Sequence, residues 1–312
     1  DTAPPLGTER KAVTSQPSCC RMAVALLAAA LLPSSSALWV RHAQPLVPWD
    51  EARRMALQTL SELSPLEKGN LVHGSNSYAL GWYVGNTQPI TRLSIPALTM
   101  QDAGNGFRPH MPGTHGSTTM WPSGLALAAT WDESLIEEVG AAMAREFRGK
   151  GSNVMLGPSV NVHRVARNGR NFEYMSGEDP YLGARLVKPF VRGAQNEGVM
   201  ATAKHFAFNE QETNRGTEGQ QVVSTSNVDA RTAWELYYPP FAAAVEAGVG
   251  AFMCSYNRVN GTHACENDAI LNRDLKGIMG FNGFVMSDWG ATHSSGAVAA
   301  GLDQDMPGGG DD

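Results

Sequence analysis

The sequence predicts an α/β protein with the architecture of a (β/α)8 barrel of the TIM type. Short apolar segments of strand length alternate with helical segments of about 10 to 20 residues, which is typical of a mainly parallel sheet covered by helices. No glycine-rich phosphate-binding turn follows the first apolar segment, and this favours a barrel over an open doubly wound sheet. With 312 residues, of which 42% are hydrophobic and 17% charged, the chain can bury the core that such a barrel needs.

The N-terminus has the layout of a secretory signal. Arg21 precedes the apolar run 22–32, and the small residues that follow offer a cleavage site after Ala37. The run is too short to span a bilayer, and a buried helix at this position stays open as an alternative. We therefore expect a secreted or extracellular protein, or one that follows the secretory pathway to a vacuole or lysosome. The expected domains are a leader and secretory signal at 1–37, an N-terminal extension at 38–65 and a barrel domain at 66–312.

The elements of the barrel follow from caps and apolar patterns. Ser64 is the expected N-cap of a helix in which Pro65 takes the first position and Glu67 completes a capping box. Asp132 is the expected N-cap of the next long helix. The expected helices span 64–72, 132–149, 181–198, 227–248 and 267–280. The expected strands lie within 94–102, 152–162, 199–206, 250–257 and 283–290.

Polar side chains follow each of these five strands. Because the carboxyl ends of parallel barrel strands meet at one mouth, we expect these side chains to converge on a shared cavity. A solvated helix start would explain one polar cluster, such as 204–215, but not five clusters in register with strand ends. The residues at the five strand ends are Gln101, Asp102 and Arg108; Arg164, Arg167 and Arg170; Lys204 and His205; Tyr256 and Asn257; and Asp288 and Trp289.

Four segments that contain these strand-end residues resemble the signature segments of glycoside hydrolase family 3. They are 169–184, 204–215, 253–261 and 283–291. Their order and spacing are also similar to that family, over about 66 to 309, and the Lys-His pair followed by Asn-Glu-Gln-Glu resembles its β-glucosidase branch. The resemblance implies a retaining β-glucosidase that hydrolyses terminal, non-reducing β-D-glucosyl residues in carbohydrate catabolism, with Asp288 as the nucleophile. It implies a sugar subsite lined by Asp102, Arg108, Arg170, Lys204, His205 and Tyr256.

The chemistry of the nucleophile agrees with that implication. A retaining glycosidase holds its nucleophilic carboxylate about 5–5.5 Å from a second carboxyl group, with the anomeric carbon between them. Asp288 must be ionised to attack, and the cations Arg170 and Lys204 are expected to favour its charged form.

The other side chains suit a sugar. The carboxylate of Asp102 can accept from paired hydroxyls, while Arg108 and its neighbouring cations donate to others. Trp289 offers a flat apolar face to the sugar ring, and Tyr256 places a phenol near the nucleophile.

Other interpretations of these residues stay open. Asp288 could cap the following helix, Lys204 could form a Schiff base as in barrel aldolases, and His205 could be a satisfied core histidine. Glu210 and Glu212 are the nearest acid candidates, but neither is assigned as the general acid. Glu173, Glu178 and Asp179 are interpreted as turn and framework residues rather than catalysts.

The general acid is expected elsewhere. The resemblance implies that the β-glucosidase branch takes its acid/base Glu from a second α/β domain after the barrel. The sequence ends at 303–312, where the resemblance places the last barrel strand, so we expect the closing helix and the second domain to lie outside this chain. In another branch of the family, the β-N-acetylhexosaminidases, a His in a KHFPGHG-like loop takes the place of the acid/base Glu. The segment 204–215 lacks that loop. This portion alone is therefore expected to be poorly active. A non-catalytic sugar-binding barrel, and a β-xylosidase or glucan exohydrolase of the same family, stay open as alternatives.

Two further features concern processing. Cys254 and Cys265 flank the Asn260-Gly261 turn signal, and in an oxidising compartment we expect a disulfide worth about 2–3 kcal/mol, with two free buried thiols as the alternative. Asn260 also begins an Asn-Gly-Thr sequon and is a candidate glycosylation site.

Composition argues against other partners. The formal net charge is −6, and no run of Lys and Arg with interleaved aromatic residues suggests nucleic-acid binding. We expect no cofactor, no metal and no membrane partner. The expected partner is a β-glucoside or β-glucan oligosaccharide.

Overall fold

The structure is a computed structural model that describes residues 46–75, 83–109, 115–215 and 223–308. The leader and secretory signal predicted at 1–37 lie outside the described residues. Within the described ranges, the main sheet has six strands in the order β1-β2-β3-β4-β6-β9. These strands are β1 Gly85–Asn86, β2 Thr99–Asp102, β3 Val154–Leu156, β4 Met200–Phe206, β6 Ala251–Cys254 and β9 Phe284–Ser287.

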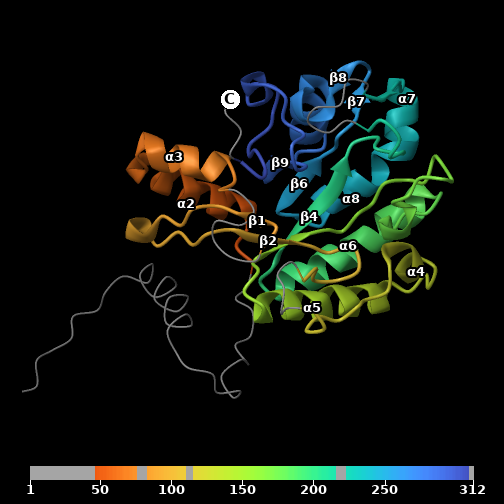
Figure 1. Ribbon diagram of the computed structural model, residues 1–312, viewed down its shortest axis with the longest axis horizontal. Coiled ribbons are helices and arrows are strands. Elements are labelled where there is room, and N and C mark those ends of the chain that lie inside the picture. The colour runs from red at the N-terminus through yellow and green to blue at the C-terminus, as the bar shows by residue number, and fades with distance from the viewer. Residues whose placement is uncertain (1–45, 76–82, 110–114, 216–222, 309–312) are drawn as a thin grey trace, which may run out of the picture.

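The five predicted strands pair in parallel and in chain order, as the alternation of apolar and helical segments indicates. Asp102 is opposite Leu156, and β4 is followed in the sheet by β6 and β9, with Cys254 opposite Ser287. Their carboxyl ends therefore lie at one edge of the curled sheet (Figure 1). This arrangement is an incomplete barrel.

One strand departs from the predicted all-parallel barrel. β1 pairs with β2 in the antiparallel sense, with Gly85 opposite Met100. The connection 87–98 turns back on itself through η1 (Thr91–Leu93) and an antiparallel bridge between Ile90 and Ile95. No crossover helix fits in this connection, and without one two strands cannot run parallel.

The gap between β9 and β1 is spanned by single bridges rather than by strands. Gln304 bridges to Met286 of β9, and Asp305 bridges to His73. The Ser75 amide then donates to the Asn86 carbonyl at the β1 edge. The segment 294–307, expected to reach the last barrel strand, contributes these bridges, the short η6 (Ser295–Ala297) and backbone hydrogen bonds from Asp303 and Gln304 to Val285 of β9, but no strand.

Helices cover the outer face of the sheet (Figure 1). The predicted capping box of Ser64 and Glu67 is confirmed at the start of α3, and Asp132 caps α5 as predicted. The predicted helix 227–248 is divided into α7, η3 and α8, since consecutive prolines at 239 and 240 start a new turn. The helices are α2 Trp49–Glu62, α3 Pro65–Val72, α4 Gly124–Ala128, α5 Glu133–Gly149, α6 Pro180–Asn196, α7 Ala230–Thr232 and α8 Pro239–Glu246. Single-turn or π-type segments are η2 Asn171–Glu173, η3 Ala233–Tyr237, η4 Ala264–Glu266 and η5 Ala269–Ile278.

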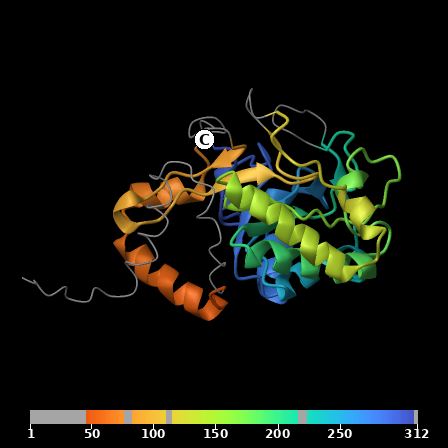
Figure 2. The same ribbon diagram turned by 90° about the horizontal axis from the view of Figure 1, so that it is seen from below.

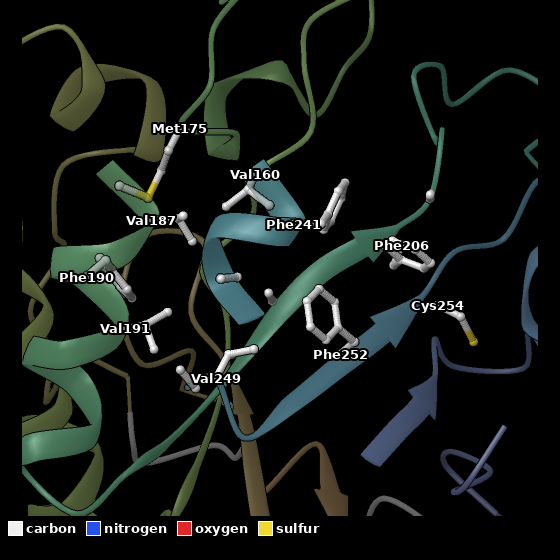
Figure 3. Packing of buried hydrophobic residues seen from close by; sticks show 14 of the residues in the cluster. Val160, Met175, Val187, Phe190, Val191, Phe206, Phe241, Val249, Phe252 and Cys254 are labelled. Atoms are coloured by element: carbon white, nitrogen blue, oxygen red, sulfur yellow. The ribbon is translucent and has the colours of Figure 1, made fainter. Parts of the chain in front are cut away.

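The core lies between the sheet and these helices. Figure 3 shows Val187, Phe190 and Val191 of α6 facing Phe206 of β4 and Phe252 of β6. The rings of Phe206 and Phe252 meet edge to face at 5.7 Å between centroids, a favoured aromatic geometry. This packing holds β4 and β6, which carry the central part of the mouth.

Two features lie outside the barrel framework. α2, in the predicted N-terminal extension, has no buried residue and stands away from the sheet (Figure 2). A second sheet joins β5 Thr225–Ser226, β7 Arg258–Val259 and β8 Thr262–His263 next to the mouth. Among the described residues, no helix has both the length and the hydrophobicity to cross a bilayer.

Candidate active site

The strand ends place most of the predicted site residues close together. Lys204 and His205 lie within β4, Asp288 directly follows β9, and Arg170 immediately precedes η2. These residues are distant in sequence. They lie close together because β4, β6 and β9 pair in parallel, which places the carboxyl ends of the strands at the same edge of the sheet.

A cavity of about 550 Å³ opens at this mouth. Its walls include Asp102, Arg108, Arg170 and Lys204, together with Glu173 and the rings of Phe107 and Phe172. Asp288, His205 and Tyr256 do not line it directly. They adjoin it through Arg170, whose guanidinium lies 3.0 Å from Nε2 of His205.

Asp288 is a buried carboxyl group, 7% exposed. One oxygen accepts from the Trp289 amide at 2.8 Å, and the other lies 3.4 Å from Nε2 of His205. Burial raises the pKa of Asp288, while Arg170, Lys204 and a hydrogen bond from Tyr256 act in the opposite direction. The two cations thus favour the charged form as expected, but desolvation outweighs them in the structure.

His205 is fully enclosed and neutral. Its burial, followed by the positive charges of Arg170 and Lys204, holds its pKa well below the ordinary value for histidine. Its contact with Asp288 is therefore not an ion pair. The other ring nitrogen, Nδ1, lies 2.9 Å from the hydroxyl of the buried Tyr174.

Glu173, which the sequence suggests is a turn and framework residue, lies in the wall of the cavity. Its carboxylate is 2.5 Å from Arg170 Nε and 3.8 Å from Lys204 Nζ. Ser159 also donates to it at 3.3 Å. The two cations keep the pKa of Glu173 low despite its burial. Its position three residues after Arg170 was the available sequence signal, but spacing alone does not show that Lys204 shares the same carboxylate. Asp179 agrees with the framework interpretation, since it caps α6.

Asp102 and Arg108 pair with each other at the cavity rim, 2.7 Å apart and both partly exposed. Their mutual salt bridge contributes little to stability at such an exposed position. Both groups stay accessible to a ligand that can compete for the same hydrogen bonds.

Glu210 supports β4 rather than facing Asp288. It accepts from the side-chain amide of Asn161, which also holds the backbone N–H and C=O of His205. Burial raises the pKa of Glu210 to about 8. The sequence gives no signal for Asn161, because it lies within an apolar segment, where an amide shows no periodicity.

Glu212 belongs to a different contact. It pairs with Arg215 at 2.5 Å, and the Arg215 guanidinium lies 4.1 Å from the centroid of the Tyr256 ring. Such a cation–π contact restrains the ring. Burial and the charge of Asp288 raise the pKa of Tyr256, so its phenol keeps the proton that it donates.

Trp289 is tied to β1. Its indole N–H donates to the Val84 carbonyl at 3.1 Å, and its ring packs against a small core cluster with Met306 and Met100. Part of the flat face expected to contact a sugar is therefore used in packing.

The remaining polar residues at strand ends do not line the cavity. Arg164 and Arg167 are exposed, and Gln101 is buried beside the amide of Asp102. Asn257 donates to backbone carbonyls of Ala207 and its own neighbour.

The two predicted processing features lie next to the small sheet. Cys254 and Cys265 form a disulfide in the structure, with their Cα atoms 5.2 Å apart. Asn260 is exposed, and its side-chain amide exchanges two hydrogen bonds with the backbone of Val228.

The arrangement of a buried carboxyl group, two cations and a neutral imidazole at the mouth of a partial barrel agrees with the family resemblance. The profile of the glycosyl hydrolase family 3 N terminal domain matches residues 69–304. The chain belongs to this family.

Relatives within glycosyl hydrolase family 3 are named as β-glucosidases. The chain is 47% identical over 265 residues to the probable beta-glucosidase M of Neosartorya fischeri, covering 83% of this chain and 33% of that protein. It is 42% identical over 272 residues to the beta-glucosidase cel3A of Pyricularia oryzae, covering 85% and 35%. The chain thus spans about a third of the length of these relatives.

Solved structures of the same family share the fold. The beta-D-glucoside glucohydrolase of Trichoderma reesei aligns with a TM-score of 0.77 at 40% identity, covering 85% of this chain and 36% of that one. DesR, a β-glucosidase from Streptomyces venezuelae in complex with D-glucose, aligns with a TM-score of 0.73 at 39% identity, covering 80% and 31%.

Proposed function

We propose that this chain forms the part of a retaining β-glucosidase that carries the nucleophile, Asp288, and the subsite for the terminal glucosyl residue. The observation that carries the proposal is the buried Asp288 carboxyl group beside His205, Arg170 and Lys204, next to an open polar cavity. The similarity to proteins named as β-glucosidases, one with D-glucose bound, supports the same substrate class.

The cavity offers the hydrogen-bonding groups that a sugar requires. Asp102 accepts from hydroxyl groups, whereas Arg108, Arg170 and Lys204 donate to hydroxyl oxygens. Phe172, which is 46% exposed, adds an apolar surface in the same wall. Such a mixture holds a ring whose edge is polar and whose faces are apolar.

In the proposed reaction, the ionised Asp288 attacks the anomeric carbon as the glycosidic C–O bond breaks. The leaving oxygen takes a proton from a general acid, and a covalent glycosyl ester of Asp288 forms. Water then attacks that ester, gives a proton to the same acid/base group and releases the sugar. Arg170, Lys204 and the Tyr256 phenol stabilise the Asp288 carboxylate before attack and after its release.

We place the general acid/base in a second α/β domain of the whole protein. Within the described residues, the two carboxyl groups considered for the role of general acid already have other partners. Glu173 is ion-paired with two cations, and Glu210 is bound to Asn161. We also propose that the protein is secreted.

The nucleophile is tested by labelling. Incubating the protein with a 2-fluoro-β-glucoside that carries a dinitrophenyl leaving group should trap the glycosyl ester, and peptide mapping should find it on Asp288. The variant Asp288→Asn keeps the shape of the side chain but removes the attacking charge, so it should take no label and lose turnover. A label on another residue, or full activity of the Asn variant, would refute the assignment.

Substrates with different leaving groups distinguish the contribution of the nucleophile from that of the general acid. A dinitrophenolate leaves without protonation, whereas the sugar alkoxide of cellobiose needs the acid. Residues 1–312 alone should therefore release dinitrophenol far faster than they cleave cellobiose. Equal rates on the two substrates would place an acid within this chain.

A non-catalytic sugar-binding barrel is the second candidate, because the polar groups that line the cavity could hold a sugar whether or not Asp288 attacks it. Glucose binding measured by calorimetry, together with failure of the 2-fluoroglucoside to label any residue at pH 5 to 8, would favour it. Comparing β-glucosides with β-xylosides and β-glucan oligosaccharides separates the activities within the family.

A further inference from the structure

Glu173 is a buried carboxylate to which the proposed reaction assigns no part. It is 7% exposed, and it is held by Arg170 at 2.5 Å, Lys204 at 3.8 Å and the Ser159 hydroxyl at 3.3 Å. A buried carboxylate without such partners would be strongly destabilising. Glu173 therefore requires these two cations, and each of them depends on Glu173 for its place at the cavity wall.

Arg170, which Glu173 holds in place, also contacts His205. Its Nε faces Glu173, while its Nη2 lies 3.0 Å from Nε2 of His205. An arginine guanidinium only donates, so Nε2 of His205 accepts and carries no proton. In a neutral imidazole the proton is then on Nδ1, where it is donated to the Tyr174 oxygen at 2.9 Å.

In this tautomer Nε2 of His205 carries no proton that could be donated to Asp288. Nε2 lies 3.4 Å from the Asp288 oxygen, so the imidazole does not donate a hydrogen bond to the carboxylate. The opposite tautomer would place an N–H at the same distance and compete for the electrons that Asp288 needs for attack. The contacts from Glu173 to Arg170 and from Arg170 to Nε2 of His205 exclude the Nε2–H tautomer.

We propose that Glu173 is a positioning residue which, through Arg170, holds His205 as the Nδ1–H tautomer and keeps the Asp288 oxygen free of a histidine hydrogen bond. This inference rests on the proposed role of Asp288. The charged and titratable groups that face Asp288 are His205 and Lys204 of β4, Arg170 before η2 and Tyr256 after β6. Those that face His205 and Tyr174 also include Arg215, Glu210 and Glu212.

The tautomer is tested directly by NMR. In protein with ¹⁵N-labelled histidine, a long-range ¹H–¹⁵N spectrum identifies which ring nitrogen carries the proton, and the His205 signals are assigned by their loss in His205→Asn. The wild-type ring should show a protonated Nδ1 and a bare Nε2. In Glu173→Gln, where the amide no longer binds Arg170 as an ion pair, the Nε2–H form should appear.

Three variants keep this test interpretable. Tyr174→Phe removes the acceptor for Nδ1–H without touching Glu173 or Arg170, and it should keep the Nδ1–H form, because the Arg170 guanidinium still donates to Nε2. Glu173→Asp retains the charge and should restore the Nδ1–H form at least in part. Glu178→Gln removes an exposed carboxylate from the same loop and should leave the His205 signals unchanged.

Activity gives an independent readout. Without the charge of Glu173, Arg170 and Lys204 act on Asp288 uncompensated and favour its ionised form. The acidic limb of kcat/KM in Glu173→Gln should therefore move to lower pH, while kcat/KM at its optimum falls roughly tenfold to a hundredfold. Glu173→Asp should return the limb toward its wild-type position.

The outcomes distinguish this inference from the proposed function. An Nε2–H signal in the wild-type protein, or an unchanged tautomer in Glu173→Gln, overturns the positioning role even if Asp288 is the nucleophile. Conversely, a label away from Asp288 overturns the proposed function whatever the tautomer of His205.

Discussion

Asp288 and Glu210 are both enclosed carboxyl groups with raised pKa values, but their surroundings differ. Asp288 is faced by two cations and a phenol, whereas Glu210 has the neutral amide of Asn161 as its hydrogen-bond partner. At Asp288, the nearby positive charges therefore offset part of the rise in pKa that desolvation causes. At Glu210 only one neutral hydrogen bond offsets it, and the pKa reaches about 8. The proposed nucleophile has compensating charges, and the carboxyl group that supports β4 has none.

At the residue scale, Glu210 makes stability depend on pH. Its pKa rises from 4.5 in the unfolded chain to about 8 in the fold, so its contribution is fully present below pH 4.5 and is lost as pH rises through 8. Glu210→Gln keeps an oxygen for Asn161 but has no charge to desolvate. Its free energy of unfolding should exceed that of the wild type by about 1–3 kcal/mol at pH 8.5, and by much less at pH 5.

Urea unfolding at the two pH values measures this difference. Glu138→Gln, an exposed carboxylate on α5, is the matched control and should show no comparable gain. A Glu210→Gln variant that is no more stable than wild type at pH 8.5 would mean that water reaches the carboxylate.

At the element scale, α5 and α6 approach closely because glycines lie at their contact. A Cβ at Gly193 of α6 would lie 2.2 Å from the Glu137 carbonyl of α5, and one at Gly140 would lie 2.7 Å from the Phe190 carbonyl. Both obstacles are backbone atoms, which cannot rotate away. The two helices in turn cover the sheet behind β3 and β4, so their spacing determines how the core behind the mouth is filled.

Gly193→Ala should therefore lower the free energy of unfolding by about 2–3 kcal/mol, because overpacking forces the helices apart despite the better helix propensity of alanine. Gly149→Ala, at the end of α5 with no atom within 4 Å of the added Cβ, should be neutral or slightly stabilising. Thermal unfolding followed by circular dichroism compares the two. Equal melting temperatures for both variants would contradict the close-contact argument.

At the scale of the whole molecule, the ring of strands closes through single bridges at 73–75 and 303–306 rather than through a strand. On the β9 side the Asp303 and Gln304 amides donate to the Val285 carbonyl. The Gly74 amide donates to the Asp305 carbonyl at 2.7 Å, and the Asp305 amide donates to Val72 at 2.8 Å. Gly74 is required here, since a Cβ would lie 2.2 Å from the Pro307 carbonyl. By contrast, β4 and β6 share a parallel ladder, with one register shift between Lys204 and Phe206, and a common aromatic core.

Hydrogen exchange should reveal this weak closure. We expect the amides of residues 73–75 and 303–306 to exchange faster than those of β4 and β6, since single bridges open locally at lower cost than a packed ladder. Gly74→Ala should accelerate exchange further at 303–306 and leave β4 protected. Gly69→Ala, in α3 with open space around the added Cβ, is the control. Uniform protection across all strands would contradict this account of the ring.

Much of the fold and part of the site could be predicted because they depend on local chemistry. The caps at Ser64 and Asp132 are decided by residues within one turn, and the confirmed parallel strands by short apolar runs. The polar residues at strand ends were recognisable because a parallel register sends them all to one edge. The sequence motifs, together with this order, also identified the family.

The rest depended on atoms that are distant in sequence. Only the tertiary structure shows that Glu173 is shared by Arg170 and Lys204, because that contact requires β4 to lie beside η2. It also decided that desolvation outweighs the cations at Asp288, since the cost of burying a charge depends on everything that surrounds it.

The sequence by itself determined which segments form strands and helices, their order and the caps at Ser64 and Asp132, because these properties follow from periodicity and capping within short segments. The tertiary structure decided how the ring closes: β1 runs antiparallel to β2, and single bridges at Gln304 and Asp305 take the place of a strand. Closure depends on how many backbone groups of distant segments can pair at once, and no local pattern in the chain encodes that number.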